Sequence, residues 1–312
     1  MYEDPGERAL RYVSIVDDDN FPEDICDITA ILPNSIKQMI GPTLVGTSQG
    51  LVCFYGSSVA VIWNPWIKKP VSIPCVVFGR GYVSVLGFGV CPKTSEPKLV
   101  KITYPTSSLE MQTWTWTVDI LSFISGCWKS CSISKISNLL CKSLSLFSSS
   151  ECVDKFIYWC AYNMKDAIWV VISFDMTNEE FGVIHLPDSF ARYEYVDLSK
   201  HRESLVLLPH DDNISKYDYD VWIMEGDVTK SFKKLFTVSS TYDCVKTMAI
   251  SYKGEAILEM LEDNSKENVI SIDTYEPASN RFKWTKITAI RWSIYMRSYK
   301  ETMLLHDFRI LN

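Results

Sequence analysis

Four histidines are the first side chains to consider as catalysts, because imidazole exchanges protons near neutral pH. His185 stands inside the apolar stretch VIHLP, which favours a place in a sheet over a role as a base. His210 opens the acidic sequence HDDN, which would suit a cation but is more typical of a solvated loop. His201 and His306 have no neighbouring motif that would make either one a general base. The histidines therefore identify no active site.

Adjacent carboxylates are the second chemical feature, because two facing carboxyl groups can hydrolyse a glycosidic bond. Such groups occur at Asp17–Asp19, Glu179–Glu180 and Glu262–Asp263. Each group falls in a polar, turn-like stretch between apolar segments. A glycosidase stays open as an alternative, and it would require two carboxyl groups at a defined separation in one pocket.

The ten cysteines contain no CxxC pair. Cys127 and Cys131 are separated by three residues, and no His or Cys pair follows at zinc-finger spacing. The sequence also lacks GxGxxG, HExxH, GxSxG and Walker motifs. We therefore expect buried, small apolar cysteines, no metal, no cofactor and no enzymatic activity.

Composition narrows the class of protein further. Of 312 residues, 47% are hydrophobic and 22% are charged, as in an ordinary globular protein. A net charge of −7 argues against binding to nucleic acid. No apolar window approaches the length of a membrane span, and the start MYEDPGERAL lacks the form of a secretory signal. We expect a cytoplasmic or nuclear location.

The stretch VVISFDMTNEEFGVIHLP (170–187) shows which elements position these side chains. Branched and aromatic residues favour extended backbone on both sides of a polar turn, DMTNEE. Pro187 ends the second apolar run, because proline cannot donate a ladder hydrogen bond. The stretch predicts a β-hairpin.

The hairpin outline recurs along the chain. The residue after the turn is Trp128, Phe181, Phe232 and Phe282 in successive copies, separated by 53, 51 and 50 residues, and Pro70 holds the same place earlier. A further apolar segment precedes each of the five hairpins, and a sixth such segment follows the last hairpin. The six segments begin at residues 50, 97, 154, 203, 254 and 301. Four-stranded units with a period of about 50 residues are typical of propeller blades.

The fold predicted is all-β: a propeller-like ring of about six four-stranded blades in a single domain, 1–312. The sixth unit, ETMLLHD and FRILN, is one strand short, and ALRYVSI (9–15) has the texture of the missing strand. Pairing the N- and C-terminal strands would close the ring and remove two exposed edges. A β-sandwich remains the alternative.

Several phrases resemble a known family when they are taken in order. They are GTSQGLVCFYG, VIWNPWIKKPVSIP, LGFGVCPKTSEPKLVKI, VISFDMTNEEFGVIHLP, SLVLL and VWIMEGDVTKSFKKLFTV. They resemble the plant F-box-associated domain over residues 9–305. The resemblance implies a kelch-like β-domain that recognises a protein for a cullin-containing ubiquitin ligase of the SCF type, docked through a separate F-box.

No complete F-box is expected in this sequence. The stretch FPEDICDITAILPNSI (21–36) has an order of proline, acidic and apolar residues similar to that at the start of an F-box. However, Pro33 would interrupt a helix that began at Asp24. We expect 21–40 to be a long loop. The resemblance then implies a module that binds an unknown target protein and does not bind a Skp-type adaptor by itself. A non-functional fragment of a longer F-box protein is a further alternative.

Aromatic residues near the second-to-third-strand loops and the between-blade crossings are candidates for target contact, because Tyr and Trp are enriched at binding hot spots. The alternative for each is packing between blades. Tryptophans inside strands, at 63, 128, 159, 169 and 222, are expected in the core. The candidate contact residues are Tyr104, Tyr162, Phe190, Tyr193, Tyr217, Tyr242, Trp292 and Tyr295.

Overall fold

The computed structural model describes residues 1–17, 21, 24–56, 58–75, 81–105, 116–123, 125–131, 144–210, 218–226, 230–239, 244–261 and 269–305. The chain divides into two units. Unit 1 consists of Met1–Leu32 and Arg192–Arg297, and unit 2 consists of Pro33–Ala191 and Ser298–Asn312.

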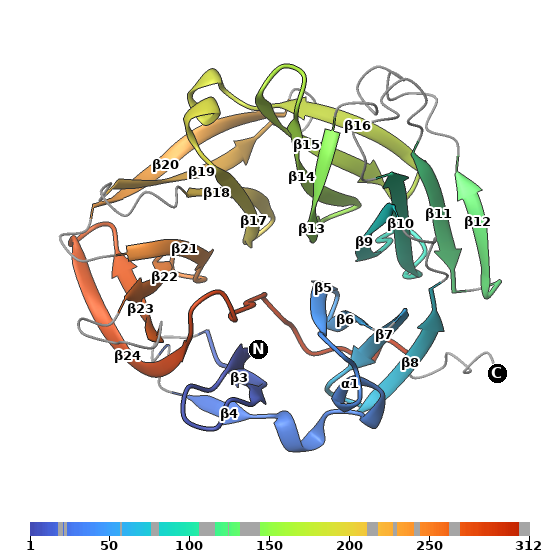
Figure 1. Cartoon of the computed structure of the whole chain (residues 1–312), viewed down its shortest axis with the longest axis horizontal. Helices are drawn as coiled ribbons and strands as arrows, with labels where there is room; N and C mark the ends of the chain where they lie inside the picture. The colour runs from blue at the N-terminus through green and yellow to red at the C-terminus, as the bar shows by residue number, and fades with distance from the viewer. Residues whose placement is uncertain are drawn as a thin grey trace. The chain divides into compact units, whose positions relative to one another are not determined.

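Unit 2 contains three four-stranded sheets, and in each of them consecutive strands are antiparallel neighbours (Figure 1). A one-turn helix, α1 (Asn34–Lys37), precedes the first sheet. The strands are β5 (Thr43–Ser48), β6 (Leu51–Gly56), β7 (Val59–Asn64), β8 (Lys69–Pro74), β9 (Tyr82–Val90), β10 (Pro97–Pro105), β11 (Thr117–Ser122), β12 (Cys127–Cys131), β13 (Leu144–Val153), β14 (Phe156–Asn163), β15 (Ile168–Asp175) and β16 (Glu180–His185).

Unit 1 contains two four-stranded sheets of the same kind and two sheets of two strands. The 3-10 helix η3 (Asp188–Arg192) leads into it, and η1 (Thr29–Ile31) follows its amino-terminal strands. The strands are β1 (Tyr2–Glu3), β2 (Leu10–Arg11), β3 (Val13–Ile15), β4 (Ile25–Asp27), β17 (Tyr195–His201), β18 (Ser204–His210), β19 (Asp218–Glu225), β20 (Ser231–Ser239), β21 (Cys244–Ile250), β22 (Ala256–Leu261), β23 (Val269–Glu276) and β24 (Arg281–Ile290).

All five predicted hairpins are formed, as the third and fourth strands of the five larger sheets. In VVISFDMTNEEFGVIHLP, Phe174 pairs with Phe181 and Val170 pairs with His185. β15 is buried along nearly its whole length, whereas β16 at the sheet edge is only partly buried. This difference explains the continuous apolar run in β15, since an inner strand of a packed sheet is covered on both faces.

A turn of one form recurs between these paired strands. The turns span residues 64–68, 175–179 and 276–280, and the last residue of each has a positive φ of 56°, 56° and 52°. A short loop that ends on a left-handed residue is a common hairpin connection, because its twist matches that of the strands. The first residue of each turn is polar, and its side-chain partners differ between sheets.

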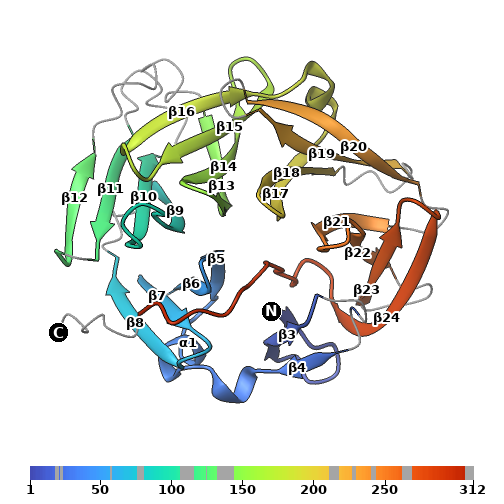
Figure 2. The same ribbon diagram turned by 180° about the vertical axis from the view of Figure 1, so that it is seen from behind.

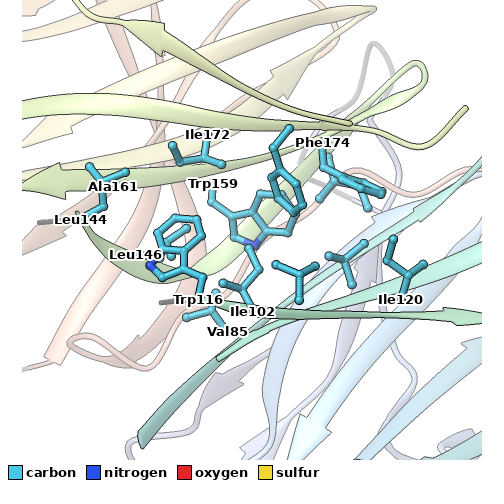
Figure 3. Packing of buried hydrophobic residues seen from close by; sticks show 14 of the residues in the cluster. Val85, Ile102, Trp116, Ile120, Leu144, Leu146, Trp159, Ala161, Ile172 and Phe174 are labelled. Carbon is cyan, nitrogen blue, oxygen red and sulfur yellow. The ribbon is translucent and has the colours of Figure 1, made fainter. Parts of the chain in front are cut away.

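The core of unit 2 includes a cluster between the sheets β9–β12 and β13–β16. Figure 3 shows Trp159 from β14 among side chains of both sheets, including Ile102. The Trp159 indole nitrogen donates to the Leu86 carbonyl oxygen over 3.1 Å. A Cβ at Gly87 would overlap the Trp159 ring, and a Cβ at Gly89 would lie 2.7 Å from the Met176 sulfur. The GFG phrase therefore provides room for close sheet packing.

The segment 298–305 packs on the first sheet of unit 2, where it crosses from β5 and the β5–β6 turn to the end of β7 (Figure 2). The Asn64 side-chain amide donates to the carbonyl oxygens of Thr302 and Leu304 over 2.9 and 2.7 Å. Leu305 is 1% exposed and belongs to the core cluster of that sheet. This late segment is therefore part of the packed structure of unit 2.

The amino-terminal strands of unit 1 pack against the sheet β21–β24. Phe21 lies in one apolar cluster with residues of that sheet, and Tyr2 and Ile15 pack against the cluster. Met1 and Tyr295 exchange backbone hydrogen bonds, at 3.1 Å from the Met1 nitrogen and 2.9 Å from the Tyr295 nitrogen. Residues far apart in sequence thus meet in unit 1.

Three expectations need correction. The described residues form five four-stranded sheets and not about six. The predicted strand ALRYVSI (9–15) is divided between β2 and β3, which pair with β1 and β4, while described residues 291–305 contain no strand. The predicted pairing of N- and C-terminal strands is therefore wrong in the part of the chain that is described. Residues 21–40, expected as a long loop, contain β4, η1 and α1.

Candidate protein-binding surface

The candidate surface lies in unit 1 at the end where β17 and β21 begin and β22 ends. Strand direction alternates within the sheet β21–β24, so β23 begins and β24 ends at this same end. Asp197 on β17 and Lys246 on β21 join the two sheets here, with their charged atoms 3.8 Å apart. This end is the loop face on which the sequence predicts partner contact.

Trp292, just after β24, is the most prominent side chain at this end. It is 46% exposed, and two cations lie over its ring: the Lys246 ammonium, 5.4 Å from the ring centroid, and the Arg291 guanidinium, 4.7 Å from it. Both distances fall within the range of a cation–π interaction. We define Lys246, Arg291, Trp292 and Tyr295 as the Trp292 platform.

A buried carboxylate hydrogen-bonds to the backbone of the platform. Glu259 on β22 is fully buried, and its Oε1 accepts the backbone N–H of Trp292 over 3.3 Å. Burial raises the pKa of Glu259 above its usual value, and the charges of Lys246 and Arg291 and the Trp292 N–H oppose this rise. Glu259 therefore anchors the backbone of the platform and attracts its two cations.

The backbone of the platform is fixed at several points. Trp292 has a positive φ of 69°, a conformation that costs about 1–3 kcal/mol for a bulky residue. The Ser293 hydroxyl donates to the Ile290 carbonyl over 2.7 Å and accepts the Glu3 N–H over 2.9 Å. Ile294 is buried in the core cluster, and Tyr295 is 37% exposed. The fold thus holds an exposed indole in a strained but well-anchored position.

A second group of charged side chains surrounds Asp220 at the start of β19. Its carboxylate accepts hydrogen bonds from Arg192 and Tyr193, each over 2.9 Å, and from Thr237 over 2.7 Å. Lys234 lies 3.3 Å away. Burial raises the pKa of Asp220, but the bonds from Thr237, Tyr193 and Lys234 outweigh it, so the pKa lies below its usual value. The group ties Tyr193 to the sheet β17–β20.

The eight predicted contact residues fall into three groups. Trp292, Tyr295 and Tyr193 belong to unit 1 and are exposed or half-buried. Tyr104 and Phe190 are buried, so they pack, as the alternative reading held for each aromatic. The remaining three are Tyr162, half-buried with its ring 5.2 Å from that of Trp169, and Tyr217 and Tyr242, which lie outside the described residues.

Sequence reasoning missed the charged members of the surface. Arg291 adjoins Trp292 in the phrase AIRWSIY, so the pair could have been noticed as a cation beside an aromatic. Lys246 and Glu259 carry no such signal, because they stand 46 and 33 residues before Trp292 and meet it only through sheet packing.

The tryptophans predicted in the core are largely placed there. Trp63, Trp159 and Trp169 are at most 3% exposed, while Trp128 and Trp222 are half-buried. The cysteines divide differently from expectation. Eight of them lie in the described residues and form no disulfide bond: five are buried, but Cys26 and Cys127 are exposed and Cys131 is half-buried. The expectation of uniformly buried cysteines is wrong for these three. Cys141 and the side chain of Cys244 lie outside the described residues.

Among the described residues, the acidic candidates do not form a catalytic pair. Glu179 lies 2.7 Å from the Lys98 ammonium and 2.5 Å from that of Lys129. Burial raises its pKa, but its bonds to these lysines outweigh that effect and leave the pKa low. A general acid needs the opposite shift. The groups at Asp18–Asp19 and Glu262–Asp263 lie outside the described residues.

Burial raises the pKa of two other carboxyl groups, those of Glu259 and Asp273. Glu259 is paired with Ile272 and Asp273 with Leu258, so the two acids lie on opposite faces of the sheet. They cannot face one bound sugar.

The histidines and possible metal ligands give the same picture. His185 is an exposed strand residue, and the ring of His210 stacks on Tyr195 at 5.3 Å. His201 Nδ1 lies 3.0 Å from the Ser251 carbonyl oxygen, and His306 is not among the described residues. The described part of the chain contains no cluster of three or more His, Cys, Asp or Glu side chains arranged to hold a metal. Among the helices of that part, none has the length and apolar character needed to cross a membrane.

Known proteins resemble this chain in sequence. The F-box/kelch-repeat protein At3g23880 of Arabidopsis thaliana is 25% identical over 270 residues, which are 84% of this chain and 68% of that protein. The putative F-box protein At3g10240 of the same plant is 24% identical over 140 residues, 45% of this chain and 33% of that protein.

Solved structures also match this chain, at low identity. Dipeptidyl peptidase 4 of Porphyromonas gingivalis has a TM-score of 0.45 at 8% identity, covering 85% of this chain and 40% of the other. Oligogalacturonate lyase in complex with manganese has a TM-score of 0.45 at 10% identity, covering 82% and 66%.

A family model gives the assignment. The F-box associated beta propeller domain matches residues 10–308, nearly the whole chain. This match confirms the resemblance deduced from the sequence phrases and the expected propeller class, with the number of four-stranded sheets corrected as above. The chain therefore belongs to the family of F-box associated beta propeller domains.

Proposed function

We propose that this chain recognises a target protein and that the Trp292 platform makes a central contact with it. The observation that carries the proposal is an exposed tryptophan, flanked by two cations and held in a strained backbone above a buried carboxylate. Tryptophan and arginine are the residues most enriched at binding hot spots. Because the backbone of the platform is already fixed, little conformational entropy is lost on binding.

We further propose that residues 1–312 act as one recognition domain in the cytoplasm or nucleus, as the receptor part of an SCF-type ubiquitin ligase. The family and the names of the two relatives support this role. In that family an F-box docks the Skp-type adaptor, and the β-domain captures the target. The 312-residue chain by itself is then expected not to bind a purified Skp-type adaptor; direct binding in a pull-down would contradict this part of the proposal.

An enzyme is the less supported alternative. Within the described residues, the buried acids Glu259 and Asp273 face opposite sides of their sheet, and Glu179 is neutralised by two lysines. A glycosidase needs two carboxyl groups across one pocket. Release of reducing sugar from a panel of plant polysaccharides would revive this alternative. A non-functional fragment would bind no partner at all.

The test is affinity capture from plant tissue extract followed by quantitative mass spectrometry. Wild-type chain is compared with Trp292→Ala and with the matched control Trp284→Ala, which removes a 59% exposed tryptophan from β24 of the same unit. We expect specific partners to be lost, by about tenfold or more, with Trp292→Ala and retained with Trp284→Ala. Equal loss with both variants, or no specific partner of the wild-type chain, would contradict the proposal.

A further inference from the structure

We propose that the Trp292 platform reads an acidic segment of its partner: a carboxylate of Asp or Glu binds Arg291, and a neighbouring apolar side chain packs on Trp292. This inference rests on the proposed function and adds the chemistry of the bound segment. It is carried by the state of Arg291, by the distribution of charge around it and by the exposure of the indole.

Arg291 has binding capacity that the described residues do not use. The side chain is half-buried, and no ion pair among the described residues includes its guanidinium. Its Nε is buried without a hydrogen-bond partner, so a bound segment would meet the terminal amino groups and not the Nε. The Arg291 Cζ atom lies over the Trp292 ring, 4.7 Å from the ring centroid. A guanidinium fixed in this way matches the geometry of a carboxylate, which accepts two parallel N–H bonds from it.

The negative charges near the platform are already engaged. Asp197 lies 3.8 Å from Lys246, and Glu259 is fully buried and accepts the Trp292 N–H. Lys246 is itself 14% exposed and pairs with Asp197, whereas Arg291 forms no ion pair within the described residues, although the charge of the buried Glu259 attracts it. One unpaired cation suits a single carboxylate better than a doubly charged phosphate.

The chain as a whole carries a net negative charge, which opposes the approach of an acidic partner. At a net charge of −7, the chain repels acidic partners at long range. Recognition of an acidic segment therefore depends on local contact, and the exposed indole supplies the apolar part of it. A segment with a carboxylate next to an aliphatic or aromatic side chain fits both features.

The test is selection from a random dodecapeptide library displayed on phage, using the folded 312-residue chain. Wild type is compared with Arg291→Gln, and with Arg202→Gln as matched control, because Arg202 also lies over an exposed ring, that of Tyr252 at 5.5 Å. We expect wild type and Arg202→Gln to enrich Asp or Glu beside an apolar residue at least about threefold more than Arg291→Gln. Unfolding midpoints of all variants check that they fold.

Selected peptides are then synthesised with Glu, Gln or phosphoserine at the enriched position, and their binding is measured by fluorescence anisotropy. Loss of Glu-peptide affinity of about tenfold or more is expected for Arg291→Gln, with partial retention in Arg291→Lys. Equal binding of Glu and Gln peptides, tighter binding of phosphoserine peptides, or unchanged acid enrichment by Arg291→Gln would overturn the inference. If Arg291→Gln fails to alter capture of the cellular partners while Trp292→Ala does, target recognition stands and acid reading fails.

Discussion

Two hairpin turns of unit 2 begin with side chains of nearly equal shape that bind different partners. Asn64 ends β7 and Asp175 ends β15. The Asn64 Oδ1 accepts the N–H groups of Trp66 and Ile67 over 2.9 and 3.3 Å. The Asp175 Oδ1 accepts N–H groups two and three residues on in the same way, over 2.8 and 3.2 Å. Both turns are therefore closed by the same local device.

The second side-chain atom makes the difference. The Asn64 amide nitrogen donates to the carbonyl oxygens of Thr302 and Leu304, whereas the second oxygen of Asp175 accepts from the Lys155 ammonium over 2.8 Å. An amide both donates and accepts, while a carboxylate only accepts. One atom thus selects whether a turn secures a distant backbone segment or a nearby lysine.

The largest expected effect comes from Asn64→Asp. The turn keeps its acceptor, but a buried carboxylate would face two carbonyl oxygens that lose their donor. We expect a loss of about 3 kcal/mol in the free energy of unfolding at pH 7, because unsatisfied buried polar groups cost about 1–3 kcal/mol each. Urea unfolding measures it, and limited proteolysis should show faster cleavage within 298–305. A loss below about 1 kcal/mol would mean that Asn64 does not hold this segment.

The next largest effect tests whether the packing of segment 298–305 stabilises unit 2. Leu305→Ala removes a side chain that is 1% exposed in the core of the β5–β8 sheet. We expect a loss of about 2–3 kcal/mol. The double mutant with Asn64→Asp should lose less free energy of unfolding than the sum of the two single-mutant losses, because either change releases the same segment. Full additivity in urea unfolding would show that the two residues act independently.

At the other turn, Asp175→Asn should cost about 1 kcal/mol at pH 7. The amide can still close the turn, but it loses the charge of the Lys155 pair, and Lys155 is 36% exposed, so solvent screens that pair. Lys155→Gln is the matched change on the partner side, and a double-mutant cycle should give a coupling below about 1 kcal/mol. A coupling several times larger would contradict the weak, screened pair inferred here.

The smallest expected effect is the pH dependence of the stability that Asp175 contributes to its turn. Burial raises the pKa of Asp175, but its bonds to Lys155, Thr177 and Asn178 outweigh this, so its pKa lies below the usual value. Its stabilising contribution is therefore present above the unfolded pKa, near 3.9, and is lost as the pH falls through the lower folded pKa. The penalty of Asp175→Asn should shrink between pH 5 and pH 2.

The stability of the Asn64→Asp variant should depend on pH for a different reason, which is the protonation of the introduced carboxyl group. A buried carboxylate facing carbonyl oxygens has a raised pKa, so protonation stabilises the folded variant, and its defect should also shrink, but at a higher pH. Midpoints of urea unfolding across pH 2–7 would separate the two curves. Coincident curves would remove the distinction between the turns.

The sequence by itself determined the local elements of this protein. Strand alternation, polar turns and the 50-residue period predicted all five hairpins, because each depends on residues close in sequence. The ordered phrases also identified the family, which the match over 10–308 confirms.

Only the tertiary structure decided which distant segments meet. The apolar pattern of ALRYVSI is that of a strand, and it is the same whichever strand is its neighbour. The pattern therefore could not predict pairing with β1 and β4. Tyr104 and Trp292 are both aromatics near strand ends, yet one is 6% exposed and the other 46%. Burial and the meeting of Glu259, Lys246 and Arg291 depend on the packing of sheets, which no short stretch of residues encodes.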